Sequence, residues 1–265
     1  MSVLPAFEHL RAGSLDEVLG AMSFDDVPYA GGTELLLAMR MGLFRPRMLI
    51  DLKRIPELLR IETEDDTLVI GGSTTHLDAA RHPAVREHAP MLASTLERVG
   101  NIRVRAQGTL GGNLCFAEPK SDVAAALIAL DAEIELRTAS ASRLVPATDF
   151  ILGPYYTVRE PEELLTVIRI PLRPNRRGVY LKYQTMERPT VGVAAIRDGA
   201  LRRAVVAAVG ERPQWFDFDD DRPIDPDTVA DGIEPEADLT GSVGYKRHVT
   251  RVFVERAAAE LEASV

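Results

Sequence analysis

Two glycine-rich segments carry the strongest chemical signal in this sequence. Ala30–Leu35 reads Ala-Gly-Gly-Thr-Glu-Leu, and Thr109–Cys115 reads Thr-Leu-Gly-Gly-Asn-Leu-Cys. In each, a pair of glycines follows a short apolar run, so the backbone could approach a phosphate without interference from a Cβ atom. A helix-like stretch follows each pair, and the free N–H groups at a helix start favour an anion. Two such segments predict one extended ligand with a diphosphate, and a dinucleotide cofactor is the first hypothesis.

The overall charge and the single cysteine exclude several classes of function. A formal charge of −9 over 265 residues, with no basic block, argues against nucleic acid as a partner. Cys115 alone cannot form an intrachain disulfide, nor an iron–sulfur or zinc site ligated only by cysteines of this chain. The acidic stretch 217–221 lacks the spacing of a calcium loop, so we predict no metal site. Any redox chemistry must therefore use a borrowed cofactor.

Neither a membrane span nor a catalytic constellation is evident. No apolar run approaches the length of a span, and the N-terminus lacks a charged-then-apolar leader, so we expect a cytoplasmic protein. The five histidines form no metal-binding or nucleophilic arrangement, and nothing is similar to a serine or cysteine triad. We therefore predict no catalytic residue.

Hydrophobic periodicity predicts mixed helices and strands in the first two thirds of the chain. Ser14, with Glu17 three positions later, has the pattern of a capping box and predicts a helix over 14–22. An alanine- and leucine-rich helix over 122–130 must be buried. The other expected helices are 34–41, 76–80 and 91–99, and the expected strands are 27–30, 48–51, 67–70, 132–137 and 164–170.

The last third predicts a small antiparallel sheet and a closing helix. Asp198-Gly199 between two apolar runs is a two-residue hairpin signal. A polar, proline-containing stretch follows the hairpin, and an amphipathic helix runs from Tyr245 to about Leu261. The three expected strands are 179–183, 191–196 and 201–209.

Further motifs accompany the two glycine segments in a fixed order. Glu118-Pro119 and Asp122 follow the second segment, and Pro161–Leu165 precedes Ile170-Pro171. Taken together, these motifs resemble the FAD-binding (medium) subunit of molybdenum hydroxylases, the carbon monoxide dehydrogenase and xanthine dehydrogenase family. The resemblance runs essentially end to end, and its C-terminal part rests on Tyr180–Tyr183, Val191–Ala194 and Tyr245–His248.

The resemblance implies an α+β fold with two domains. A vanillyl-alcohol-oxidase (PCMH)-type FAD-binding domain would occupy residues 1–173, in subdomains of about 1–57 and 58–173. A C-terminal domain of antiparallel sheet and helices would occupy 174–265. FAD would lie extended between the subdomains, with its isoalloxazine reaching towards the C-terminal domain. The region 211–244 is shorter and more acidic than is usual in the family, so different packing is expected there.

The resemblance also implies which residues bind FAD. The N–H groups of Gly31 and Gly32 would reach the pyrophosphate, and Thr33 could add a hydroxyl donor. Glu34 would cap N–H groups or point outward, because a carboxylate beside a diphosphate is repelled. The second segment would hold the diphosphate and the ribityl chain. The residues at cofactor-binding positions are Ala30, Gly31, Gly32, Thr33, Glu34, Leu35, Thr109, Gly111, Gly112, Asn113, Asp122, Leu165 and Lys182.

Several of these positions have a purely structural alternative. Asp122 would accept hydrogen bonds from the cofactor's hydroxyl groups, or only favour the start of its helix. Lys182, one of only four lysines, would stabilise negative charge on the reduced flavin, or be an exposed strand residue. Tyr180 or Tyr183 could lie against the flavin, although tyrosines in strands are commonly structural.

Three further positions also have two readings. Leu165 matches a family position at the adenine end of the cofactor, although a leucine in a strand indicates by itself only core packing. His76 is expected to begin a helix, with a cofactor contact as the alternative. Cys115 is expected to be a small buried residue rather than a reactive thiol.

The same resemblance implies partners. A large molybdopterin subunit would oxidise the substrate, a small subunit with 2Fe–2S clusters would relay electrons, and the flavin would pass them to NAD, oxygen, a quinone or another acceptor. The assembly would be a dimer of heterotrimers. An autonomous FAD-dependent oxidoreductase is the alternative, but no acid or base for it is evident. An assembly subunit without cofactor is disfavoured by the intact glycine segments.

Overall fold

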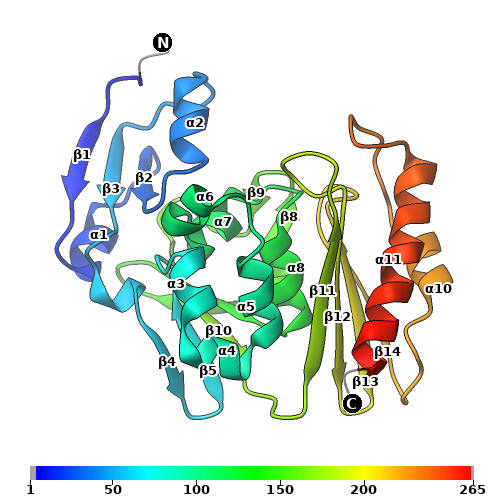
Figure 1. The fold of residues 1–265 in the computed structure, drawn as a ribbon. Coiled ribbons are helices and arrows are strands. Elements are labelled where there is room, and N and C mark those ends of the chain that lie inside the picture. Colours follow the sequence, from blue (N-terminus) through cyan, green and yellow to red (C-terminus); the bar gives the residue numbers. More distant parts are fainter. Residues whose placement is uncertain (1–3, 264–265) are drawn as a thin grey trace.

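The computed structural model describes residues 4–263, and its strands form three larger sheets with helices packed against them (Figure 1). Residues 1–3 and 264–265, the outer ends of the two expected domains, lie outside the described residues. None of the helices within residues 4–263 has the length and apolarity needed to cross a membrane.

The first sheet is a small parallel sheet with strand order β1-β3-β2. Ser14 caps its first helix by accepting a hydrogen bond from the N–H of Glu17, and the Glu17 carboxylate accepts one from the N–H of Gly13. The expected capping residues are therefore confirmed. The first strand was not expected, because it has a single apolar residue and pairs on one side only. The elements are β1 (Glu8–Arg11), α1 (Leu15–Ala21), β2 (Asp26–Tyr29), α2 (Leu35–Arg40) and β3 (Met48–Asp51).

The second sheet is antiparallel, with order β4-β5-β10-β6-β7, and its central strand β10 is almost wholly buried. The strands expected at 67–70, 132–137 and 164–170 are confirmed. The two edge strands were missed because β4 carries mainly polar side chains and β7 buries only one of its five residues. The strands are β4 (Ile61–Glu64), β5 (Thr67–Gly71), β6 (Glu133–Arg137), β7 (Ser142–Pro146) and β10 (Leu164–Pro171), with a small hairpin of β8 (Ile151–Gly153) and β9 (Tyr156–Thr157).

Short helices pack on the second sheet and fill the space between it and the third (Figure 1). The most buried is α8 (Asp122–Ala129), in which all eight residues are buried, as expected from its composition. The others are η1 (Pro56–Leu58), α3 (His76–Arg81), α4 (Pro83–His88), α5 (Pro90–Leu96), α6 (Ile102–Gln107), α7 (Leu110–Phe116) and α9 (Ala147–Phe150).

The third sheet is antiparallel, with order β11-β12-β13-β14, and is buried on both faces. Along β12, Ala194 and Ile196 join the core around α8, whereas Val193 and Ala195 pack in the core under the last helix. The predicted hairpin is confirmed, but its turn begins at Gly199, which has φ +57°. The elements are β11 (Arg177–Tyr183), β12 (Val191–Asp198), β13 (Leu201–Ala207), β14 (Gln214–Phe218), α10 (Pro226–Gly232) and α11 (Val243–Ala263).

The prediction of three strands and one helix in this last third was wrong. The stretch expected to be polar and irregular contains a fourth strand, β14, and a second helix, α10. Strand β14 sits at the edge of the sheet, so its outer side chains stay partly exposed and its sequence carries no clear alternation. Helix α10 has a sequence signal that was missed: the Asp225 side chain caps it, and Pro226 is its first residue.

Candidate cofactor site

The first glycine segment forms a tight turn between β2 and α2. Gly32 has φ +67°, a conformation that glycine adopts without strain. At Gly31 an added Cβ would lie 2.1 Å from the carbonyl oxygen of Gln107, at the end of α6. Both glycines are therefore required by the backbone itself, one for the turn and one for the close approach of α6.

This turn presents a row of unused backbone donors. Within residues 4–263, the N–H groups of Gly31, Gly32, Thr33, Glu34 and Leu35 have no hydrogen-bond acceptor. The segment is partly exposed, so these donors can reach a ligand as well as water. Successive N–H groups at the start of a helix form an anion-binding surface. The geometry thus suits a diphosphate.

An arginine from the third sheet reaches this turn. Arg188, in the connection between β11 and β12, contacts the Glu34 carboxylate at 2.9 Å and the Glu118 carboxylate at 3.0 Å. The Tyr155 hydroxyl donates to the same Glu118 carboxylate at 2.9 Å. The Glu34 side chain makes no cap hydrogen bond and is paired with a cation, which reduces its repulsion towards an anion. Sequence reasoning missed Arg188, because nothing near it in the chain marks it.

The second glycine segment has a different structure from the one expected. It is not a loop: Gly111 and Gly112 lie in the first turn of α7, capped by the Thr109 hydroxyl, which accepts from the N–H of Gly112 at 3.1 Å. The N–H of Gly111 donates to the carbonyl of Gly72 at 2.9 Å, and the N–H of Asn113 donates to the carbonyl of Thr109 at 2.9 Å. A diphosphate cradle made of these N–H groups is therefore not available here.

The glycines of the second segment instead allow backbones to stack. An added Cβ on Gly111 would lie 2.6 Å from the Gly72 carbonyl oxygen, and one on Gly72 would lie 2.5 Å from the Leu165 carbonyl oxygen. Leu165 is buried in β10 as a core residue beside this stack. The side chains of the segment are also engaged within the protein: the buried Thr109 hydroxyl caps α7, and the Asn113 amide oxygen accepts from the Ser121 hydroxyl at 2.6 Å.

Asp122 joins the start of α8 to the third sheet. Its carboxylate accepts from the Tyr180 hydroxyl at 2.5 Å and from the Lys182 ammonium at 2.8 Å, and Lys182 also donates to the carbonyl of Arg98 at 2.8 Å. Burial, followed by the charge of Asp122, raises the pKa of Tyr180 well above its ordinary value, so the phenol stays protonated. Lys182 is held at a fixed place rather than exposed on a strand, and Asp122 serves protein groups at the start of α8.

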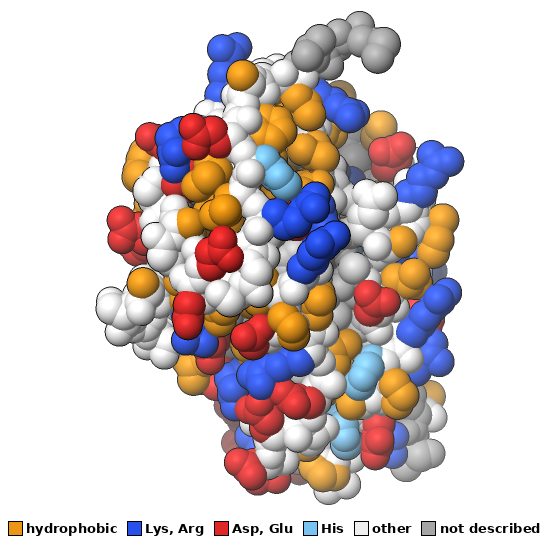
Figure 2. Space-filling model, turned by 90° about the vertical axis from the view of Figure 1, so that its left-hand side faces the viewer, with side chains coloured by type: hydrophobic (Ala, Val, Ile, Leu, Met, Phe, Trp, Pro, Cys, Tyr) orange, Lys and Arg blue, Asp and Glu red, His pale blue; other side chains and the backbone are white. Residues whose placement is uncertain are grey.

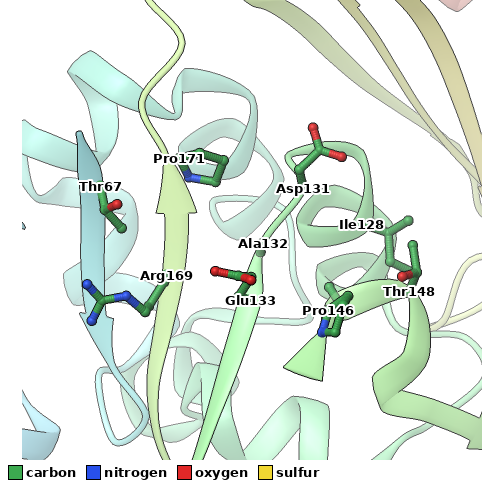
Figure 3. Close-up of a pocket in the computed structure, with 10 residues that line it drawn as sticks. Thr67, Ile128, Asp131, Ala132, Glu133, Pro146, Thr148, Arg169 and Pro171 are labelled. Carbon is green, nitrogen blue, oxygen red and sulfur yellow. The ribbon is translucent and has the colours of Figure 1, made fainter. Parts of the chain in front are cut away.

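The cavity enclosed by the chain lies away from all of these residues. It has a volume of about 250 Å³ and sits where β5, β6 and β10 meet α8 and α9 (Figure 3). Thr67 and Pro171 line it, at the opposite ends of β5 and β10 from Gly72 and Leu165. Its polar groups include Glu133 and Arg169. The glycine segments, not this cavity, carry the features of a cofactor site.

Comparison with known proteins decides which cofactor the site serves. A family model described as the FAD binding domain in molybdopterin dehydrogenase matches residues 5–173, well over half of the chain. The chain belongs to this family. Its cofactor is FAD, and it is an oxidoreductase subunit of the carbon monoxide dehydrogenase and xanthine dehydrogenase type.

Relatives of this FAD-binding chain cover it nearly from end to end. It is 29% identical to the glyceraldehyde dehydrogenase medium chain of Sulfolobus acidocaldarius, over 97% of this chain and 99% of that one. It is 36% identical to the carbon monoxide dehydrogenase medium chain of Hydrogenophaga pseudoflava, over 72% of this chain and 69% of that one. Quinoline 2-oxidoreductase from Pseudomonas putida 86 superposes with a TM-score of 0.90 at 28% identity, over 99% of both chains. The predicted α+β, PCMH-type fold is confirmed.

Beside the second segment, the FAD-binding chain buries two polar groups without partners. His76 begins α3, as expected, and its Nδ1 has no hydrogen-bond partner among the described residues; nor has the hydroxyl of Thr74. Burial, and then the charge of Arg105, lowers the pKa of His76 to about 4, so the imidazole is neutral. Thr74 was missed by sequence reasoning, because a threonine in a Ser-Thr-Thr run carries no distinctive signal.

The single cysteine, Cys115, is not a reactive thiol. Burial raises the pKa of the Cys115 thiol to about 11, so it stays protonated at neutral pH, as expected of a structural cysteine. Residues 4–263 contain no group of three or more histidine, cysteine, aspartate or glutamate side chains placed to hold a metal.

Proposed function

We propose that this chain is the electron-transfer subunit of a molybdenum hydroxylase complex, and that it moves electrons from 2Fe–2S clusters of a small partner subunit to an external acceptor. The observation that carries the proposal is the row of five unused N–H groups from Gly31 to Leu35. Bound FAD would supply the redox chemistry, since the isoalloxazine can accept and release electrons. The substrate would be oxidised on a large molybdopterin subunit.

In this proposal the first segment binds the diphosphate and the second supports the flavin end. The donors at 31–35 would bind the phosphate oxygens, while the Thr109 and Asn113 side chains would contact the ribityl chain. Lys182, fixed by Asp122, would place a positive charge beside the ring, where it favours the reduced, anionic flavin. Leu165 would contribute apolar surface to the cofactor or to the core behind it.

We further propose that residues 1–173 hold FAD and that residues 174–265 close over its flavin end. Contacts between the two parts support this division. Arg98 donates to the carbonyl of Tyr180 at 2.9 Å, Lys182 returns a bond to the carbonyl of Arg98, and Arg188 reaches the first segment. Arg188 thus contacts the first glycine segment through Glu34, whereas Tyr180 and Lys182 contact Asp122 of the first domain.

One preparation tests the proposal. The chain is purified with a large and a small partner subunit, the flavin and iron are quantified, and reduction of the flavin by substrate is followed with and without the small subunit. We expect one FAD per chain, flavin reduction only when the small subunit is present, and a mass that fits a dimer of heterotrimers. Flavin reduction by substrate in the isolated chain would instead establish an autonomous oxidoreductase. A cytoplasmic location is part of the proposal and is checked by cell fractionation.

A further inference from the structure

Helix α2 and the loops beside it expose a group of large apolar side chains. Phe24, Leu37, Met41, Leu43 and Phe44, here called the α2 patch, are between 42% and 79% exposed. They fall within a stretch of 21 residues that also contains the first glycine segment. Such a group exceeds the scattered apolar residues that any surface carries, and it indicates a contact surface.

The α2 patch is continuous in space as well as in sequence. The N–H of Leu43 donates to the carbonyl of Ala38, which folds the loop back onto the end of α2. The N–H of Arg47 donates to the carbonyl of Asp25, which brings the loop with Phe24 beside the segment that follows Phe44. Helix α2 stands at the upper end of the first sheet in Figure 1, and hydrophobic side chains gather in the upper part of the face shown in Figure 2.

Folding does not account for these side chains. Met39 is the single buried residue of α2, and the core of the first sheet is formed mainly by α1, Ile50 of β3 and residues after β3. The patch residues therefore contribute little to the stability of this chain. They remain in contact with water, which costs free energy that a partner surface would recover.

The charges around the α2 patch indicate the chemistry of its partner. Arg40 and Arg45 border the patch, and within residues 4–263 neither makes an ion pair or a side-chain hydrogen bond. Arg47, by contrast, is paired with Glu8 and Asp26. Both guanidinium groups are exposed and therefore available to carboxylates of a partner. A surface with an apolar centre and a carboxylate rim would complement them.

A second copy of this chain is a poor match. A two-fold contact places the same patch on both sides, so Arg40 and Arg45 would face their own counterparts. Like charges brought together in this way cost free energy. We propose that the α2 patch docks a different protein: a subunit of the hydroxylase complex whose matching surface is apolar at its centre and acidic at its rim. This inference rests on the proposed function.

The test uses the complex itself. The double variant Leu43→Asp/Phe44→Asp and the charge reversal Arg40→Glu/Arg45→Glu are each co-expressed with the large and small subunits, and the affinity of assembly is measured with purified components. The control is Leu144→Asp, which alters a similarly exposed leucine on the edge strand β7. We expect assembly at least tenfold weaker for both double variants, a weaker salt dependence for the charge reversal, and unchanged assembly for the control.

FAD content separates this inference from the proposed function. All variants are expected to keep one FAD per chain, because the patch side chains lie on the surface of α2 and its loops. Normal assembly of both double variants would overturn the docking surface while leaving the electron-transfer function intact. Self-association of the isolated chain that Leu43→Asp/Phe44→Asp abolishes would also overturn it, in favour of a contact between copies. An unsubstituted chain that carries FAD but binds neither subunit would overturn both proposals.

Discussion

The two glycine segments share a sequence signature but not a structure. Residues 30–35 form an open turn whose successive N–H groups have no acceptor within the described residues. Residues 109–113 form a helix start whose N–H groups at Gly111, Gly112 and Asn113 are all bonded within the protein. Paired glycines indicate only that something approaches the backbone closely. In the second segment the group that approaches is the backbone of Gly72.

The two segments therefore have different roles in the cofactor site. The open segment is free to bind a charged ligand, and the closed segment fixes the framework on which the flavin end would rest. The closed segment is bonded to residues 72–76 by two backbone hydrogen bonds, from Leu110 to Thr74 and from Gly111 to Gly72, and the adjoining Gly108 accepts a third from His76. Substitutions should therefore affect FAD affinity at the first segment and folding at the second, except where a glycine of the first segment itself packs on backbone.

The largest effect is expected where a Cβ would collide with backbone. Gly31→Ala and Gly111→Ala should each reduce the free energy of unfolding by about 3 kcal/mol, because the colliding carbonyls of Gln107 and Gly72 cannot move aside as a flexible side chain would. Chemical denaturation of the FAD-free chain measures this effect. Gly153→Ala, which meets nothing within 4 Å, is the matched control and should be neutral. A neutral Gly111→Ala would break the description of the closed segment as a backbone stack.

His76 gives the closed segment a pH dependence that the open segment lacks. Its pKa is about 4 in the folded chain against an ordinary 6.5, so between these values the unfolded chain binds a proton that the folded chain does not. Stability should therefore fall as the pH drops from about 6.5 to about 4, by about 3 kcal/mol in total. Denaturation curves measured across this pH range should show a smaller fall in the free energy of unfolding for His76→Gln than for the unsubstituted chain. The exposed control His248→Gln should show the same fall as the unsubstituted chain. Equal slopes in both variants would show that His76 is not the group responsible.

Arg188 connects the open segment to the third sheet, so its loss should act on the cofactor more than on the fold. Arg188→Ala should release FAD several-fold faster, an effect of about 1 kcal/mol, because the exposed contacts to Glu34 and Glu118 hold the β11–β12 connection beside the segment. Flavin fluorescence on dilution follows the release. Arg197→Ala, which removes a similar pair with Glu262 on the other side of the sheet, should leave the rate unchanged. Equal rates of FAD release from the unsubstituted chain, Arg188→Ala and Arg197→Ala would argue against this contact.

The smallest pair of effects compares the two threonines. Thr109→Val removes the cap of α7 and should cost about 1 kcal/mol of stability. Thr33→Val removes a hydroxyl that makes no hydrogen bond within the described residues, so stability should change by less than about 0.5 kcal/mol while FAD binds more weakly. Thermal melts of the FAD-free chain and FAD titrations separate the two. A larger loss of stability from Thr33→Val than from Thr109→Val would reverse the assignment of the segments.

Much of the fold could be predicted from sequence because the central elements carry strong patterns. The buried helix α8, strands β5, β6, β10, β12 and β13 and helix α11 are apolar or amphipathic over their whole length. Edge strands β1, β4, β7 and β14 could not be predicted, because a strand paired on one side needs little apolar surface. Helix α4 buries a single residue and α6 buries none, so neither carries a clear apolar period.

The site could be predicted in part for a related reason. Glycine pairs and a rare lysine are visible in the sequence, but whether an N–H group is free depends on contacts made by residues far along the chain. The acceptor for Gly111 comes from Gly72, and the partners of Lys182 are Asp122 and Arg98. Arg188 lies 154 positions from Glu34. No local pattern reports such pairings.

The most direct test of the division between the segments is amide hydrogen exchange with and without FAD. The account predicts that the N–H groups of residues 31–35 exchange rapidly in the FAD-free chain and become strongly protected when FAD binds, while those of Gly111, Gly112 and Asn113 are protected in both states. Protection gained at residues 111–113 on FAD binding, with residues 31–35 unchanged, would contradict it.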